Sequence, residues 1–121
     1  PGTAAGYYID ALTLSRNANY FMGIGFCLMG GTALAISRGD IAAALEFHGA
    51  IEAHLDFLER SMPRAYSAPY RELVTTLLAA EAADAALDGI RARAAIAPQN
   101  AVLADLSAHL ADVAAAADTA A

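Results

Sequence analysis

The sequence predicts an all-α fold, a bundle of about four helices around a long, glycine-containing and buried N-terminal helix. Apolar residues recur at steps of three and four along most of the chain, as on one face of a helix. No segment alternates with the period of two that is typical of a strand. Alanine, which favours helix, supplies much of the 58% hydrophobic content. The 121 residues are enough for a single helical domain (residues 1–121) with its own core.

The longest stretch without a charge covers residues 20–37, and we expect the other helices to pack around it. Its eighteen residues reach the length of a membrane span, but they include four glycines, a threonine and a serine. We therefore predict a helix buried in protein rather than in a membrane, where small residues let neighbouring backbones approach. The first helix is expected over residues 3–37. A kink or break is predicted at Gly30-Gly31, so this segment forms either one long helix or two stacked ones.

Three further helices are expected over residues 41–61, 70–95 and 99–117. Gly39 can end the first helix and Asp40 can cap the second. Pro63 ends the second helix, Pro69 marks the start of the third, and Pro98 separates the third from the fourth. In the second helix, His48 falls on the apolar stripe, and we expect a core histidine that is hydrogen-bonded to a neighbour.

Charge and cysteine content limit the classes of function. The net charge is −6, and the seven basic residues are scattered arginines, so a nucleic-acid partner is not expected. The single cysteine, Cys27, lies in the uncharged stretch and is expected to be a buried apolar side chain. No signal-peptide pattern is present, and the composition suits a cytoplasmic protein. The other two histidines, His54 and His109, are expected at the surface.

Two sequence patterns suggest a binding site, one for a nucleotide and one for a divalent metal ion. The glycines of 23–25 and 30–31 resemble a nucleotide-binding loop, but they lie within a predicted helix rather than between a strand and a helix. A dinucleotide would therefore need another domain. Several carboxylates at helical spacing suggest a divalent-metal site like that of all-α nucleotide pyrophosphohydrolases: Asp56, Glu59, Glu81, Asp84 and Asp88, with His48 and Glu52 as possible additions. The alternative is a solvated face with local ion pairs, and we assign no metal ligand.

The N-terminal sequence PGTAAGYYIDALTLSRNANYFMGIGF resembles the start of the C-terminal helical domain of imine reductases and 3-hydroxyisobutyrate dehydrogenase-like NAD(P)-dependent oxidoreductases. TALAISRGDIAAALEF is similar to the connection between the next helices of that domain, and residues 63–77 are similar to the loop that follows. The resemblance covers most of the chain, although its motifs are degenerate and rich in alanine.

The resemblance implies that this chain is the C-terminal part of a longer one. It would close a substrate cleft over NADPH or NADH held by a Rossmann domain, bind a small-molecule substrate, and pair with a second copy as a homodimer. The proton donor would be Asp10 or, in the other alignment, Tyr8, and we favour Asp10. A carboxyl group beside an apolar wall favours its neutral form and can donate a proton as hydride arrives. Two alternatives stay open: a non-catalytic bundle that binds a partner or a small apolar ligand, and the metal-dependent pyrophosphohydrolase.

Overall fold

The computed structural model describes the backbone of residues 2–120 and the side chains of residues 3–117. All regular structure in that range is helical, which confirms the all-α fold class. The helices, with two short 3₁₀ segments labelled η, are α1 (Gly2–Asn17), α2 (Phe21–Ser37), α3 (Ile41–Ile51), η1 (Glu52–His54), α4 (Leu55–Arg60), α5 (Arg64–Ala83), η2 (Ala85–Leu87), α6 (Ile90–Ile96) and α7 (Gln99–Ala120). The expected count of about four is not confirmed, because each of the first three expected helices is divided.

The predicted N-terminal helix is divided at residues 18–20 and not at Gly30-Gly31. Asn19 has a φ of 51°, a left-handed conformation that asparagine adopts more readily than most residues, and the chain reverses there. Gly30 and Gly31 lie inside an unbroken α2. They serve close packing: a Cβ added to Gly30 would lie 2.2 Å from the Tyr8 ring, and one added to Gly31 would lie 2.3 Å from Leu106. The glycine-rich buried helix is therefore the second in the chain.

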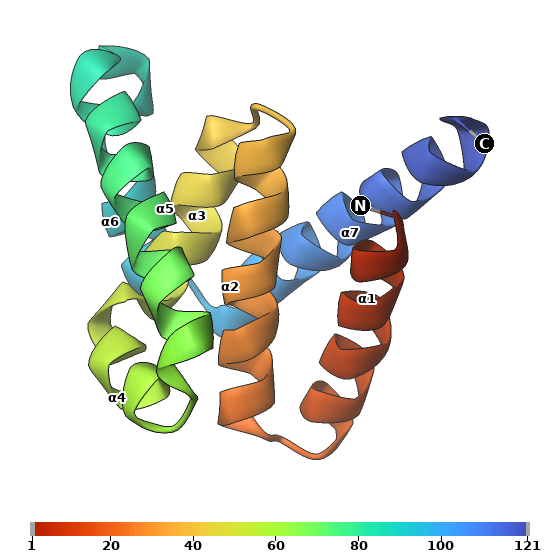
Figure 1. Cartoon of the computed structure of the whole chain (residues 1–121). Coiled ribbons are helices and arrows are strands. Elements are labelled where there is room, and N and C mark those ends of the chain that lie inside the picture. Colours follow the sequence, from red (N-terminus) through yellow and green to blue (C-terminus); the bar gives the residue numbers. More distant parts are fainter. Residues whose placement is uncertain (1, 121) are drawn as a thin grey trace.

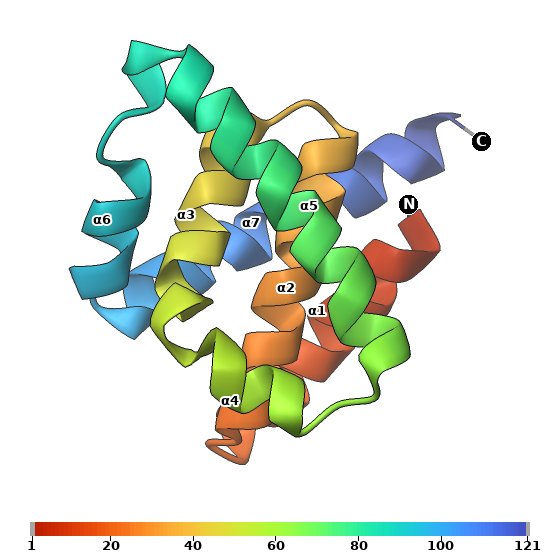
Figure 2. The ribbon, with the colours of Figure 1, turned by 60° about the vertical axis from the view of Figure 1, so that its left-hand side comes forward.

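Figure 1 shows α2 in the middle of the fold, with α1 on one side, α3 on the other and α7 passing behind. In Figure 2, α5 crosses in front of α2 and α3. Most of the α2 side chains from Ile24 to Thr32 are buried by these helices of the same chain. The coverage of α2 thus does not require a second copy, and the homodimer stays a prediction.

The predicted junction between the second and third helices of the structure is confirmed. Gly39 has a φ of 75°, and the Asp40 side chain caps α3 by accepting a hydrogen bond from the Ala43 N–H at 3.1 Å. By contrast, α5 begins at Arg64 and not at residue 70, so Pro69 lies inside the helix. The starts of α3 and α5 therefore have different causes. The Asp40 side chain caps α3, whereas α5 follows Pro63, whose backbone is extended.

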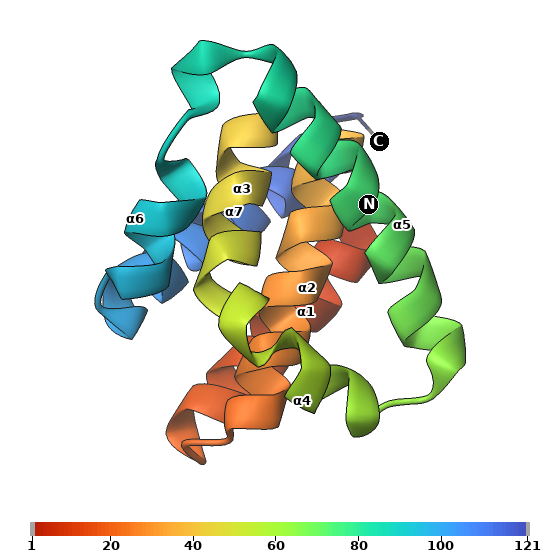
Figure 3. The same ribbon diagram turned by 90° about the vertical axis from the view of Figure 1, so that its left-hand side faces the viewer.

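Two further divisions were not expected from the sequence. The helix predicted over 41–61 changes to a 3₁₀ turn at η1 before continuing as α4, and the helix predicted over 70–95 ends at Ala83. Gly89, with a φ of 81°, precedes α6 and lets the chain return along α3. Figure 3 shows α6 beside α3 as a result.

The core contains most of the apolar positions that helical spacing predicted. In the second and fourth predicted helices (41–61 and 99–117), the buried residues at steps of three and four are Leu45, His48, Ile51, Leu55 and Leu58, and Leu103, Leu106, Leu110 and Val113. They meet α2 from two sides and exclude water from the centre of the bundle. Within residues 2–120, none of the helices combines the length and apolarity of a membrane-spanning segment.

Candidate functional site

The two candidate proton donors on α1 have different surroundings. Asp10 is exposed, and the exposed side chains of Tyr7 (60% exposed) and Leu14 (70% exposed) lie one turn before and after it. Residues three or four apart share a helix face, so these three form one exposed strip, which we call the α1 face. The expected apolar wall is corrected in part: Leu14 belongs to this face, but Leu12 is buried in the core.

Tyr8 is held against α2 instead. Its ring lies over Gly30 and 5.8 Å, centroid to centroid, from the ring of Phe26. The Cys27 thiol lies 3.8 Å from the Tyr8 carbonyl oxygen, to which it donates a weak hydrogen bond. Burial, with smaller contributions from Cys27 and Tyr7, raises the pKa of Tyr8 above its ordinary value. The ring therefore packs α1 onto α2, and Asp10 is the candidate that the helix exposes to solvent.

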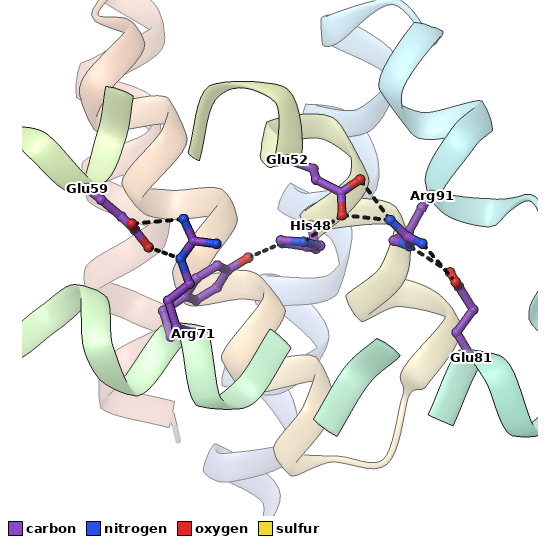
Figure 4. Close-up of polar contacts among 7 residues, drawn as sticks. His48, Glu52, Glu59, Arg71, Glu81 and Arg91 are labelled. Carbon is purple, nitrogen blue, oxygen red and sulfur yellow. Dashed lines mark hydrogen bonds and ion pairs between the residues drawn. The ribbon is translucent and has the colours of Figure 1, made fainter. Parts of the chain in front are cut away.

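A chain of polar contacts links α3 to α5 inside the protein (Figure 4). The His48 Nδ1 atom lies 2.7 Å from the Tyr70 hydroxyl oxygen, and its Nε2 atom lies 3.2 Å from a Glu52 carboxylate oxygen. A carboxylate only accepts, so Nε2 carries the proton and Nδ1 accepts from the tyrosine hydroxyl. Burial lowers the pKa of His48, while Glu52 opposes that shift. His48 is only 1% exposed, which confirms the predicted core histidine. Its two hydrogen bonds hold α3, η1 and α5 together.

Arg91 continues this network to α6. Its Nη1 atom lies 2.7 and 2.6 Å from the two carboxylate oxygens of Glu52, and its Nε and Nη2 atoms lie 2.7 and 2.9 Å from those of Glu81 (Figure 4). The Glu81 pair has the two-point geometry that suits a guanidinium and a carboxylate, whereas at Glu52 one nitrogen is shared by both carboxylate oxygens. The bonds to Arg91 are the main cause that lowers the pKa of Glu81. Arg91 thus ties the ends of α3, α5 and α6 together.

Four of the carboxylates considered for a metal site bind an arginine or cap a 3₁₀ turn. Arg71 of α5 binds Glu59 through two nitrogens and lies 3.0 Å from Asp56, while Glu81 binds Arg91. The Asp84 carboxylate accepts from the Ala86 N–H at 3.0 Å. Among the described residues, no three His, Cys, Asp or Glu side chains are grouped so that they can hold a metal ion. The geometry favours the ion-pair interpretation of these acids.

A pair of carboxyl groups between α3 and α7 was not predicted from the sequence. Glu46 and Asp105 line a groove of about 460 Å³, next to Arg93 of α6. Burial, and then the hydrogen bond and charge of Asp105, raise the pKa of Glu46 to about 7. The two side chains therefore share a proton below neutral pH and repel each other above it.

Changing Glu46 to glutamine should raise the melting temperature at about pH 8 and have little effect at about pH 4. The folded-state pKa of about 7 exceeds the ordinary 4.5, so ionising Glu46 destabilises the folded state as pH rises through that interval. The expected gain at high pH is at most about 1 kcal/mol, since the carboxyl group is only partly buried and solvent screens its charge. Thermal unfolding followed by circular dichroism measures it. Glu72→Gln, at an exposed acid on α5, is the control. An equal effect of Glu46→Gln at both pH values would contradict the shared proton.

His109 was predicted at the surface, and that prediction is wrong. The side chain is 9% exposed and meets the Phe47 ring edge-on, with centroids 5.5 Å apart. Its Nε2 atom has no hydrogen-bond partner among the described residues, and burial lowers its pKa. The signal was present in the sequence: His109 lies three residues after Leu106 and so on the buried face of α7. His54 is exposed, as predicted.

Comparisons of the chain with protein-family models, with curated proteins and with solved structures gave no match. The family resemblance of the sequence therefore stays a prediction.

Proposed function

We propose that this chain is the helical domain that closes the substrate cleft of an NAD(P)-dependent oxidoreductase similar to imine reductases and 3-hydroxyisobutyrate dehydrogenase-like enzymes. The observation that carries the proposal is the α1 face. An exposed carboxylate with an exposed tyrosine before it and an exposed leucine after it is what a cleft wall requires when a second domain completes the cleft. Once covered, a carboxyl group between apolar side chains favours its protonated form and can donate a proton.

In this proposal Asp10 is the proton donor. Tyr8 keeps the helix in place, because its ring lies over Gly30 and its carbonyl accepts from Cys27. Tyr8 thus packs inward, and Asp10, two positions later on the helix, faces the substrate. A small-molecule imine, aldehyde or ketone would receive the proton of Asp10 on its nitrogen or oxygen.

The dinucleotide, NADPH or NADH, would be held by a Rossmann domain of the same polypeptide. The residues described here do not fit it: Gly25, Gly30 and Gly31 are buried within α2, where their amides bond to the helix and are not free to bind a phosphate. The cofactor supplies the hydride, and this chain supplies the cleft wall and the proton. A homodimer that completes the cleft belongs to the same proposal.

The proposal is tested on the complete polypeptide that contains this sequence. We expect it to bind NADPH or NADH, seen as a change in nicotinamide fluorescence, and to oxidise the bound cofactor when a cyclic imine or a small aldehyde acid is added. The 121-residue chain alone should do neither. A complete polypeptide that binds neither dinucleotide would exclude the proposed function.

A further inference from the structure

A cavity of about 190 Å³ lies where the first turns of α2 meet the end of α3, the end of α6 and the start of α7. Figure 2 shows these ends of α3, α6 and α7 beside one another. The inner wall consists of apolar side chains that are no more than 5% exposed: Ile24, Leu28, Ile51, Val102 and Leu103. The outer rim includes Phe21, His54 and Gln99. The buried side chains of the lining are thus apolar, and its polar side chains, His54 and Gln99, belong to exposed residues.

Small side chains create this space. Gly25, Ala50, Ala94, Ala95 and Ala97 line it from three elements and the loop after α6. Protein interiors are packed closely, with few voids larger than a water molecule, and unfilled volume lowers stability. An apolar cavity of about 150 Å³ in another protein excludes water and binds benzene. A space of about 190 Å³ with such walls therefore has the size and chemistry of a site for a small organic molecule.

The lining also indicates the class of ligand. The described residues around the cavity include no Asp, Glu or Arg, so a charged ligand would find no partner there. His54 and Gln99 are exposed at the rim and can each exchange one hydrogen bond. The His54 ring is fixed edge-on against Phe21, with centroids 5.2 Å apart. We propose that this cavity binds a compact, uncharged, mainly apolar ring compound, whose single polar group faces His54 or Gln99.

This site is separate from the proposed reductase cleft, because its lining comes from α2, α3, η1, α6 and α7, whereas Asp10 belongs to α1. The inference therefore does not depend on the oxidoreductase proposal. Its test also uses no nicotinamide cofactor, so the two can fail independently.

The test uses phenol and indole as probes, added to the 121-residue chain and followed by methyl NMR spectra. We expect saturable shifts at the methyl groups of Ile24, Leu28 and Ile51, with a Kd on the order of 1 mM or lower for ligands of this size. Ala50→Leu, which fills the cavity, should weaken binding at least tenfold. Ala104→Leu, the same change at an exposed position of α7, should leave it unchanged. Benzoate, a charged ring of similar size, should bind at least tenfold more weakly than phenol.

Three results would overturn the proposal: no saturable shifts with either probe, equal binding by Ala50→Leu and the unaltered chain, or benzoate binding as tightly as phenol. If Ala50→Leu does not fold, xenon provides the second measurement on the unaltered chain. Xenon occupies apolar voids, so a cavity open to ligands should show xenon-dependent shifts at the same methyl groups. Their absence would show that the space is closed to ligands and would equally reject the site.

Discussion

If the complete polypeptide is the proposed oxidoreductase, Asp10→Asn should lower its kcat by about 10²–10⁴-fold, the usual contribution of a positioned general acid. The amide keeps the shape of the carboxyl group but cannot release a proton to the substrate. Binding of the nicotinamide cofactor should not change, since Asp10 lies on α1 and the proposal assigns the cofactor to another domain. The measurement is the steady-state oxidation of NADPH or NADH with a saturating substrate, together with cofactor binding by fluorescence.

Two variants serve as controls for Asp10→Asn. Asp88→Asn changes an exposed acid that follows η2 and should leave kcat unaltered. Tyr8→Phe removes the hydroxyl of the other candidate donor while keeping the ring that lies over Gly30, and it should also retain activity. Loss of activity in Tyr8→Phe with full activity in Asp10→Asn would assign the proton to the tyrosine. A rise in KM alone for Asp10→Asn would assign Asp10 to substrate binding rather than to proton transfer.

The fold class and several helix ends were predictable because they depend on local sequence. Gly39 and Asp40 end one helix and cap the next through atoms a few residues apart, and Pro63 and Pro98 act on their own neighbours. The reversal at Asn19 also has a local signal, because asparagine adopts the left-handed conformation seen there more readily than most residues. The sequence instead favoured a break at Gly30-Gly31, eleven residues later, because two consecutive glycines weaken a helix more than a single asparagine does.

Gly30 and Gly31 show why the remaining ends could not be predicted. Whether a glycine breaks a helix or lets another helix approach depends on what packs against it, and Tyr8 and Leu106 are 22 and 75 residues away in sequence. The Arg91 network is similar, because its bond to Glu52 spans 39 residues. The sequence showed the spacing of the carboxylates but not the arginines that bind them, so a metal site and a set of ion pairs looked alike.

The positions of Asp10 and Tyr8 on α1 were predictable from the sequence, but their surroundings were not. Asp10 and Tyr8 were identified from a resemblance, and the helical period alone places them on different faces of α1. The reversal at residues 18–20 decides which face of α1 is covered by α2. The sequence pattern favoured a break at Gly30-Gly31 instead. The apolar cavity depends on four helix ends that meet only in the folded protein, so no sequence pattern indicated it.

Gly49→Ala should lower the free energy of unfolding by about 2–3 kcal/mol, although alanine is the better helix former. A Cβ at position 49 would lie 2.6 Å from the Arg91 carbonyl oxygen and 2.8 Å from its Cα. These are backbone atoms, which cannot move aside as a flexible side chain does, so α6 must shift away from α3. That shift also strains the bonds of Arg91 to Glu52 and Glu81. Urea unfolding followed by circular dichroism measures the loss.

Gly6→Ala is the matched control, because it makes the same change where an added Cβ has no atom within 4 Å. There the helix preference of alanine acts alone and should raise the free energy of unfolding by about 0.5–1 kcal/mol. The two variants are thus expected to differ in sign as well as in size, and the difference isolates the close approach of α3 and α6 from helix propensity. If Gly49→Ala were as stabilising as Gly6→Ala, α6 would not lie against α3 at this position, and the polar network through Arg91 would lose its structural basis.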